Sequence, residues 1–226
     1  MYGKVKEARE KNYKFNSSMI LDWFCQLAIG LDHIHNKKVL HRDLKTQNIF
    51  LTSSNTVKIG DFGISKPLDY TEQLADTPLG TPFYLSPEVV LGQKYDYKSD
   101  IWMLGCVLYE LITLRKPFEG NFFEIVRRIV NEPFKSIEDD EIEAAYLPVF
   151  QKLLGILLNK CAPLRCSASE LLELPELRDR IARFTQPSGE QIIKPEERKL
   201  EVPNSNHFSA YREAIAKKQF QLKLQR

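Results

Sequence analysis

The segment 99–114 is apolar on almost every side of the helix that it predicts. A helix without a polar face is stable only when neighbouring elements cover it all round, so it lies in the middle of a domain. A chain of 226 residues is long enough to build one such core. The residues that make this segment apolar are Ile101, Trp102, Met103, Leu104, Val107, Leu108, Tyr109, Leu111 and Ile112.

Further patterns predict a mainly α-helical fold with one small β-hairpin. Apolar residues spaced by three and four predict a helix over 15–35, which Asn16 or Ser17 can cap and Phe15 can staple to Ile20. Residues 48–51 and 56–60 flank a polar turn and predict the hairpin. A loop is expected up to about Val90. Shorter helices are expected at 122–130, 147–158 and 167–172, with Lys152 and Lys160 on solvated faces.

Bulk composition excludes several partners and compartments. The net charge is +2, which favours neither nucleic acid nor a membrane surface. No apolar run approaches the about 20 residues that cross a bilayer, and the first residues are too charged for a signal peptide. The four cysteines lack C-x-x-C spacing and are interpreted as reduced thiols, so we expect a cytoplasmic protein.

Four side chains around one short motif are those that phosphoryl transfer requires. Asp43 can accept or orient a hydroxyl proton, and Lys45 adds a fixed positive charge nearby. Asn48 and Asp61 offer the hard oxygen ligands that Mg²⁺ prefers. A lone H-R-D tripeptide would be uninformative, but five motifs occur in order. They are H-R-D-L-K-x-x-N, the hairpin, D-F-G, G-T-P-F-Y-x-S-P-E and S-D-I-W-x-L-G.

These motifs resemble the large C-terminal lobe of the protein kinases. The resemblance implies ATP and Mg²⁺ as cofactors, with Asp43 as the catalytic aspartate, Asn48 as the second magnesium ligand and Asp61 as the primary one. Lys45 points to serine/threonine specificity and therefore to protein substrates. Two further residues are similar to known kinase positions: Thr81 to a threonine that bridges Asp43 and Lys45, and Phe50 to the side chain that supports the adenine ring.

Other matching positions are expected to be structural. Glu88 should pair with Arg165, because the Arg fork suits a buried carboxylate. Asp100 resembles the residue that holds the backbone of the catalytic loop. His41, Phe62 and Gly63 are expected to serve packing and backbone freedom rather than chemistry.

The wording of the motifs narrows the resemblance to the NIMA-related kinases. It is carried by residues 20–24, 47–52, Gly60 and 80–88, covers about residues 1–185, and departs at Cys166, where kinases usually have proline. A cytoskeletal, centrosomal or ciliary location would follow from this resemblance alone.

Arg42 and Thr77 suggest regulation by phosphorylation. Arg42 beside the catalytic aspartate needs a negative partner, which a phosphate can supply. Thr77 is the matching site by resemblance, although it can also be read as an ordinary loop hydroxyl. Phosphorylated Thr77 would then order the segment 61–88.

The chain lacks sequence features of the small kinase lobe. It contains no G-x-G-x-x-G, and it opens in a stretch that resembles the short helix just after the inter-lobe hinge. We therefore expect a truncated kinase domain over 1–185, inactive in isolation, followed over 186–226 by a polar linker and a basic tail. Residues 208–226 are either a solvated tail or the binding segment of a regulatory partner. The alternative to an enzyme is an inactive lobe that acts as a binding or regulatory module.

Overall fold

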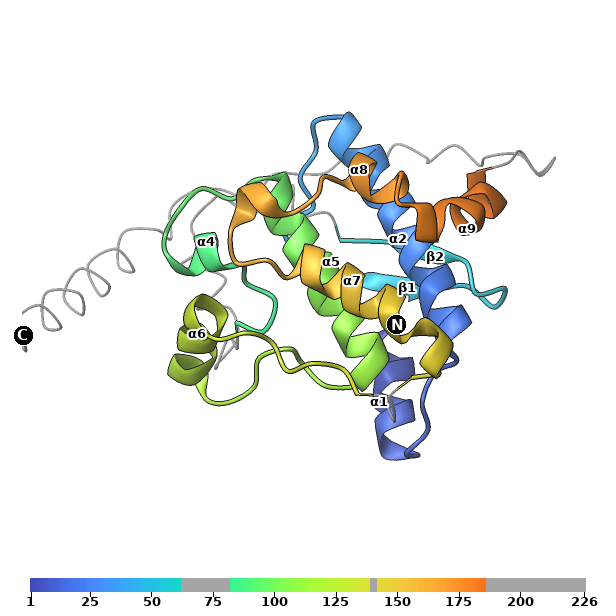
Figure 1. Ribbon diagram of the computed structural model, residues 1–226, viewed down its shortest axis with the longest axis horizontal. Coiled ribbons are helices and arrows are strands. Elements are labelled where there is room, and N and C mark those ends of the chain that lie inside the picture. The colour runs from blue at the N-terminus through green and yellow to red at the C-terminus, as the bar shows by residue number, and fades with distance from the viewer. Residues whose placement is uncertain (62–81, 139–141, 186–226) are drawn as a thin grey trace, which may run out of the picture. The chain divides into compact units, whose positions relative to one another are not determined.

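Helix α5, Tyr97–Thr113, runs through the middle of the structure (Figure 1). The computed structural model describes residues 1–61, 82–138 and 142–185. Every residue of α5 from Ser99 to Ile112 is buried, which confirms the prediction from the apolar segment. Asp96 caps the start in a capping box with Ser99. The helix ends at Thr113 and is followed by Leu114, whose backbone is left-handed at φ 57°.

The other helices surround α5 within one unit of the chain, Met1–Gln186. Helices α2 and α7 pack against α5, and α8 and α9 pack against α2 (Figure 1). The bounds are α1 Tyr2–Glu10, α2 Ser17–Asn36, α4 Pro87–Val90, α6 Phe122–Asn131, α7 Leu147–Leu157, α8 Ala168–Leu172 and α9 Pro175–Thr185, with short 3₁₀ turns at Thr46–Asn48, Ala144–Tyr146 and Ala162–Leu164. Among the residues described, each helix is too short or too polar to cross a membrane.

The structure decides which residue caps α2. The side chain of Asn16 accepts a hydrogen bond from the backbone N–H of Met19 at 3.1 Å, so Asn16 is the cap and Ser17 is the first helical residue. Phe15 is buried just before the cap, and its ring meets Trp23 edge to face at 5.3 Å. The entry of the chain into α2 is thereby fixed on the core side.

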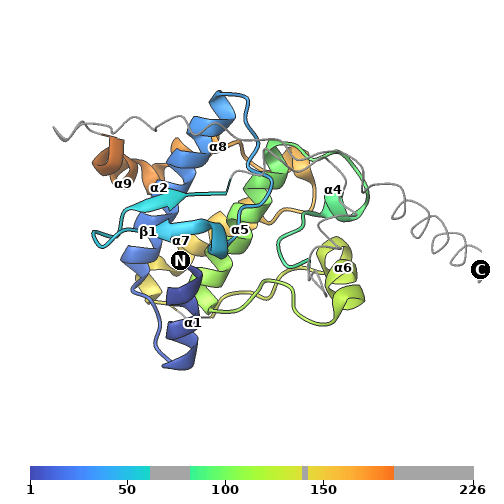
Figure 2. The same cartoon turned by 180° about the vertical axis from the view of Figure 1, so that it is seen from behind.

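The predicted hairpin is confirmed. Strands β1, Ile49–Leu51, and β2, Val57–Ile59, pair antiparallel with Ile49 opposite Ile59. The hairpin lies across α2 (Figure 2), where the side chain of Gln26 accepts a hydrogen bond from Val57 N–H at 2.9 Å. This contact fixes the hairpin to the helical core.

Two helices were not predicted from the sequence. Helix α4 is four residues long, too short for a periodic pattern. Helix α9 buries only Leu177 and Ile181, so most of its residues are polar. The predicted boundary at residue 185 stays a prediction, because 186–226 lies outside the described residues.

The expectation for Lys160 was wrong. Its ammonium donates hydrogen bonds to the carbonyl oxygens of Arg128 and Ile129, at 3.1 and 2.6 Å, in the last turn of α6. It also lies 4.1 Å from the ring centre of Phe118 and 5.1 Å from that of Trp102. Burial lowers its pKa to about 8. The open carbonyls at a helix end need donors, which is why a lysine here turns inward.

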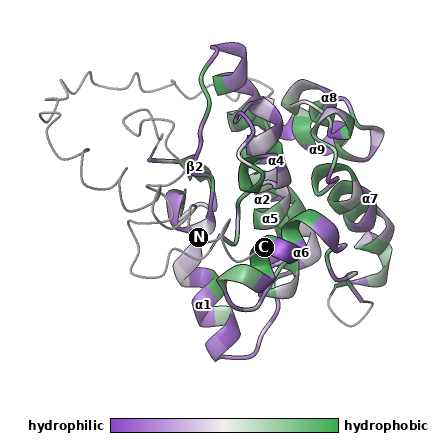
Figure 3. Cartoon of the chain, turned by 90° about the vertical axis from the view of Figure 1, so that its left-hand side faces the viewer, coloured by the Kyte–Doolittle hydropathy of each residue, from purple (hydrophilic) through white to green (hydrophobic). Residues whose placement is uncertain are grey.

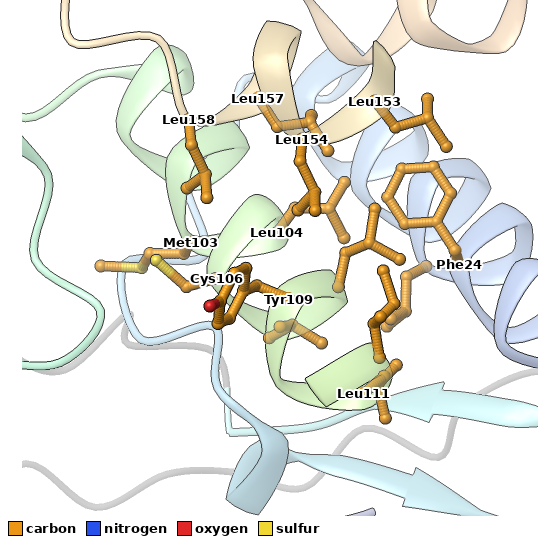
Figure 4. Packing of buried hydrophobic residues seen from close by; sticks show 14 of the residues in the cluster. Phe24, Met103, Leu104, Cys106, Tyr109, Leu111, Leu153, Leu154, Leu157 and Leu158 are labelled. Atoms are coloured by element: carbon orange, nitrogen blue, oxygen red, sulfur yellow. The ribbon is translucent and has the colours of Figure 1, made fainter. Parts of the chain in front are cut away.

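Helices α5 and α7 approach each other closely at Gly105. Leu154 and Leu157 of α7 and Leu158, which follows that helix, lie over α5, and Leu153 lies beside Phe24 of α2 (Figure 4). Hydrophobic residues concentrate on α5 and α7, whereas α1 is more hydrophilic (Figure 3). A Cβ at Gly105 would come within 2.8 Å of Leu157 Cβ and 2.9 Å of Leu158 Cδ2, so only glycine permits this crossing.

Gly105→Ala is therefore expected to destabilise the protein. Overpacking costs about 1–3 kcal/mol, set against about 1 kcal/mol gained from helix propensity. Gly155→Ala is the matched control, because its Cβ would meet nothing within 4 Å and should raise the free energy of unfolding by about 0.5–1 kcal/mol. Urea denaturation measures the free energy of unfolding of both variants and of the wild type. Equal effects of the two substitutions would contradict the close α5–α7 contact.

Candidate active site

The hairpin brings Asn48 and Asp61 together. The backbone N–H of Gly60 donates to the carbonyl oxygen of Asn48 at 2.9 Å, which extends the ladder by one residue beyond β1 and β2. Asp61 follows directly and has a left-handed backbone, φ 51°, with an exposed side chain. Two residues with oxygen-bearing side chains, one just before β1 and one just after β2, therefore lie at the open end of the hairpin.

The Asp43 carboxylate is held by two donors on one oxygen. Lys45 Nζ lies 2.8 Å from Asp43 Oδ2, and Asn48 Nδ2 donates to the same oxygen at 2.9 Å and to the Asp43 carbonyl at 2.8 Å. Within residues 1–61, 82–138 and 142–185, Asp43 Oδ1 has no hydrogen-bond partner. The side chain is 25% exposed, so this oxygen can accept a proton from a hydroxyl that approaches from outside.

Asp100 fixes the backbone that precedes Asp43. Its fully buried carboxylate accepts hydrogen bonds from the backbone N–H groups of His41 and Arg42, each at 2.9 Å. Asp100 also forms hydrogen bonds with two side chains: His35 Nε2 lies 2.9 Å from Asp100 Oδ2, and the Tyr95 hydroxyl donates to Asp100 Oδ1. Arg42 is left-handed, φ 68°, a conformation costly for a residue with a Cβ. The bonds to Asp100 offset that cost and hold the loop in place.

The His41 ring joins the segment that carries Asp43 to the one that carries Asp61. It is fully buried, its Nε2 donates to the Gly60 carbonyl at 3.1 Å, and its Nδ1 accepts from Asp43 N–H at 3.3 Å. These partners assign the neutral tautomer with the proton on Nε2. Burial lowers the pKa of His41 below its ordinary 6.5, despite the nearby Asp100 carboxylate. The ring is therefore a neutral spacer between the loop of Asp43 and that of Asp61.

Glu88 and Arg165 form a two-bonded ion pair. The two terminal guanidinium nitrogens donate to the two carboxylate oxygens at 2.8 Å each, and Ser99 Oγ adds a bond at 2.7 Å. Burial alone would raise the pKa of Glu88, but the bonds from Arg165 and Ser99 hold it below its ordinary value. The pair fixes α4 to the start of α5 and to the turn before Arg165.

Phe50 offers an apolar surface beside these polar groups. Its side chain is 52% exposed, and its ring lies so close to Gly60 that an added Cβ would be 2.6 Å from Phe50 Cε2. Of the other predicted site residues, Phe62, Gly63, Thr77 and Thr81 lie outside the described residues. The side chain of Arg42 makes no ion pair with another described residue.

The donor set fits a hard divalent cation that also binds substrate oxygens. Asn48 and Asp61 supply an amide and a carboxylate oxygen. No group of three His, Cys, Asp or Glu side chains in the described part of the chain could hold a metal alone. Magnesium typically takes one or two protein ligands and completes its shell with water and phosphate. The residues present fit that pattern.

Sequence reasoning missed a second polar group near the catalytic loop, made by Thr46, Tyr84, Glu110 and Lys116. Glu110 is 1% exposed although it belongs to the predicted all-round apolar segment. A carboxylate inside such a segment needs a buried partner, and that was the available signal.

Comparison with known proteins agrees with this geometry. A family model described as the protein kinase domain matches residues 1–175. Serine/threonine-protein kinase Nek1 of Mus musculus is 44% identical over 188 residues, covering 83% of this chain and 15% of that protein. Human Nek5 is 42% identical over 194 residues, which cover 83% of this chain and 26% of Nek5. Nek11 of Macaca fascicularis is 41% identical over 192 residues, which cover 84% of this chain and 29% of Nek11. The chain thus spans less than a third of each of these relatives.

The neutral state of His41 predicts an acid-sensitive loop. The folded pKa lies below 6.5, so the folded state binds fewer protons than the unfolded state at slightly acidic pH. Stability is therefore full above pH 6.5 and declines as the pH falls toward the folded pKa. Unfolding measured from pH 8 to 5 should show this slope, and His41→Gln should reduce it. His33→Gln, at an exposed position of α2, controls for the substitution. An unchanged slope in His41→Gln would refute the prediction.

Proposed function

The chain belongs to the protein kinase family, among the NIMA-related serine/threonine kinases, and we propose that its protein transfers the γ-phosphoryl group of ATP to protein serine or threonine. The observation that carries this proposal is the Asp43 carboxylate. One oxygen is held by Lys45 and Asn48, and the other, which has no hydrogen-bond partner among the described residues, would receive a substrate hydroxyl. Such a group can orient the hydroxyl and take up its proton during transfer.

The neighbouring residues supply the remaining functions. Asn48 and Asp61 would hold magnesium, which when bound neutralises charge on the phosphates. Lys45 places a positive charge beside Asp43, at 2.8 Å, where the transferred group would pass. Phe50 would support the adenine ring with its half-exposed face. Asp100 and His41 hold these groups in their places without touching the substrate.

Phosphoryl transfer by protein kinases also uses a Gly-rich loop that covers the phosphates. The sequence given has no G-x-G-x-x-G loop to cover the phosphates and spans only a fraction of its relatives. Activity of the whole protein, its protein substrates and a cytoplasmic, cytoskeletal, centrosomal or ciliary setting are parts of the proposal. The alternative is that the lobe acts without catalysis, as a module that binds substrates or regulators, with 208–226 as a further contact.

Control by phosphorylation is a second part of the proposal. Arg42 adjoins the catalytic aspartate, and its guanidinium has no ion-pair partner among the described residues. Phosphate on Thr77 could bind that guanidinium and order the segment 61–88.

Asp43→Asn should abolish most of the activity of the full-length protein. Losing the group that accepts the hydroxyl proton lowers the transfer rate by about 100-fold or more. Transfer of radiolabelled phosphate from Mg-ATP to serine- and threonine-containing peptides measures it. Asp179→Asn, on the exposed face of α9, is the matched control and should keep full activity. Equal rates in wild type and Asp43→Asn would overturn the proposal. Magnesium-dependent turnover by the 226-residue chain, lost in Asp43→Asn, would exclude the binding module.

Thr77→Ala should lower the activity of the full-length protein that has been phosphorylated in cells. Removing the phosphate partner of Arg42 is expected to leave the segment 61–88 less ordered. Rates before and after phosphatase treatment measure the effect. Phosphatase should lower the wild-type rate and leave Thr77→Ala unchanged. A Thr77→Ala variant as active as wild type would end the hypothesis.

A further inference from the structure

Lys116 and Glu110 form a buried ion pair next to the candidate site. Lys116 Nζ lies 2.6 Å from Glu110 Oε1, and the two side chains are 14% and 1% exposed. Glu110 belongs to α5, and Lys116 follows the left-handed end of that helix at Leu114. Burying two charges costs free energy that only close pairing and further hydrogen bonds offset. The Lys116–Glu110 pair therefore requires further hydrogen-bond partners.

The second oxygen of Glu110 binds two hydroxyl groups from different parts of the chain. Glu110 Oε2 accepts from the Tyr84 hydroxyl at 2.5 Å and from Thr46 Oγ1 at 3.2 Å, and the two hydroxyls lie 3.2 Å apart. Burial, reinforced by Glu110, raises the pKa of Tyr84, so its phenol stays protonated and donates. We call Thr46, Tyr84, Glu110 and Lys116 the Lys116 cluster.

Lys116 also binds Tyr84 directly. Its ammonium donates to the Tyr84 hydroxyl and lies 4.2 Å from the centre of the Tyr84 ring and 5.8 Å from that of Phe83. Cation–π contacts of this kind are strongest when the cation is desolvated, as it is here. One lysine therefore contacts both aromatic residues at the centre of the turn 82–85, which the bond from Leu85 N–H to the Pro82 carbonyl closes at 3.1 Å.

The cluster joins that turn to the catalytic loop. Thr46 follows Lys45, the partner of Asp43. On its other side the turn leads into α4, which the Glu88–Arg165 pair fixes to the core. The turn is thus held by Thr46, Glu110 and Lys116 on one side and by the Glu88–Arg165 pair on the other, next to the loop that carries Asp43. A peptide substrate whose hydroxyl group reaches the Asp43 carboxylate has to pass the residues next to the catalytic loop. The turn 82–85 belongs to these residues, because Tyr84 contacts Thr46 of that loop.

We propose that Lys116 is a positioning residue for the protein substrate, since its ammonium holds the turn 82–85 against the catalytic loop through Glu110 and Thr46. This inference rests on the proposed function and concerns binding of the peptide rather than of ATP. Arginine can replace lysine here, because it keeps the positive charge that Glu110 needs. Methionine keeps most of the length but leaves a buried carboxylate without its partner.

Steady-state kinetics of the full-length protein test the proposal. Lys116→Met should raise KM for a peptide substrate by about tenfold, within the range of coupling between neighbouring residues, while KM for ATP stays unchanged. Lys116→Arg should restore the peptide KM to within about threefold of wild type. Lys152→Met is the matched control: it removes a surface ion pair with Glu176 and should behave as wild type. Equal rises in both KM values, or no rise, would overturn the proposal.

A second variant guards against simple misfolding. Glu110→Gln combined with Lys116→Met removes both charges, which is less costly than removing one. If this double variant folds, as judged by circular dichroism, its peptide KM should still be raised because the ammonium is absent. A wild-type KM in the folded double variant would refute the role of Lys116.

Hydrogen exchange of the 226-residue chain tests the same contact without catalysis. The Leu85 amide should exchange at least about tenfold faster in Lys116→Met than in wild type, and at the wild-type rate in Lys116→Arg and Lys152→Met. Unchanged exchange in Lys116→Met would overturn the proposal even if the protein is a kinase. If the wild-type protein transfers no phosphoryl group, that result counts against the proposed function. The exchange rate of the Leu85 amide still decides in that case whether Lys116 holds the turn.

Discussion

The candidate site depends on the buried carboxylate of Asp100. A fully buried charge is costly unless hydrogen bonds satisfy it, and Asp100 accepts four, two of them from backbone N–H groups of the catalytic loop. The donors that stabilise this carboxylate are therefore the same groups that place His41 and Arg42. Any movement of the loop would remove two of the four hydrogen bonds of this buried charge, so core stability and site geometry are coupled.

Glu110 repeats this arrangement further along α5. Ten residues separate it from Asp100, which corresponds to about 15 Å along a helix. Asp100 binds the start of the catalytic loop, and Glu110 binds Thr46 close to its end. Helix α5, which is buried from Ser99 to Ile112, thus presents two buried carboxylates to one loop. Because α5 is packed on all sides, its two carboxylates are fixed in position, and they in turn fix the loop that carries the candidate site residues.

Local sequence patterns predicted much of the fold, and the exceptions have physical reasons. The central helix and the hairpin follow from patterns that a short window contains, and the cap of α2 was narrowed to two neighbouring residues. Helix α9 was missed because only Leu177 and Ile181 of its eleven residues are buried. Lys160 was misjudged because the carbonyls that it satisfies belong to α6, thirty-one and thirty-two residues earlier.

The sequence by itself determined the kinds of chemical group available, their order and the family, because motif spacing is a local property of the chain. It also indicated Asp43, Lys45, Asn48 and Asp61 as the reactive set. Only the tertiary structure decided which partners meet. Asp100 reaches His41 across 59 residues and Thr46 reaches Glu110 across 64. Such pairs depend on how the helices pack, and no window of sequence contains that information. The role of Lys116 became visible only there.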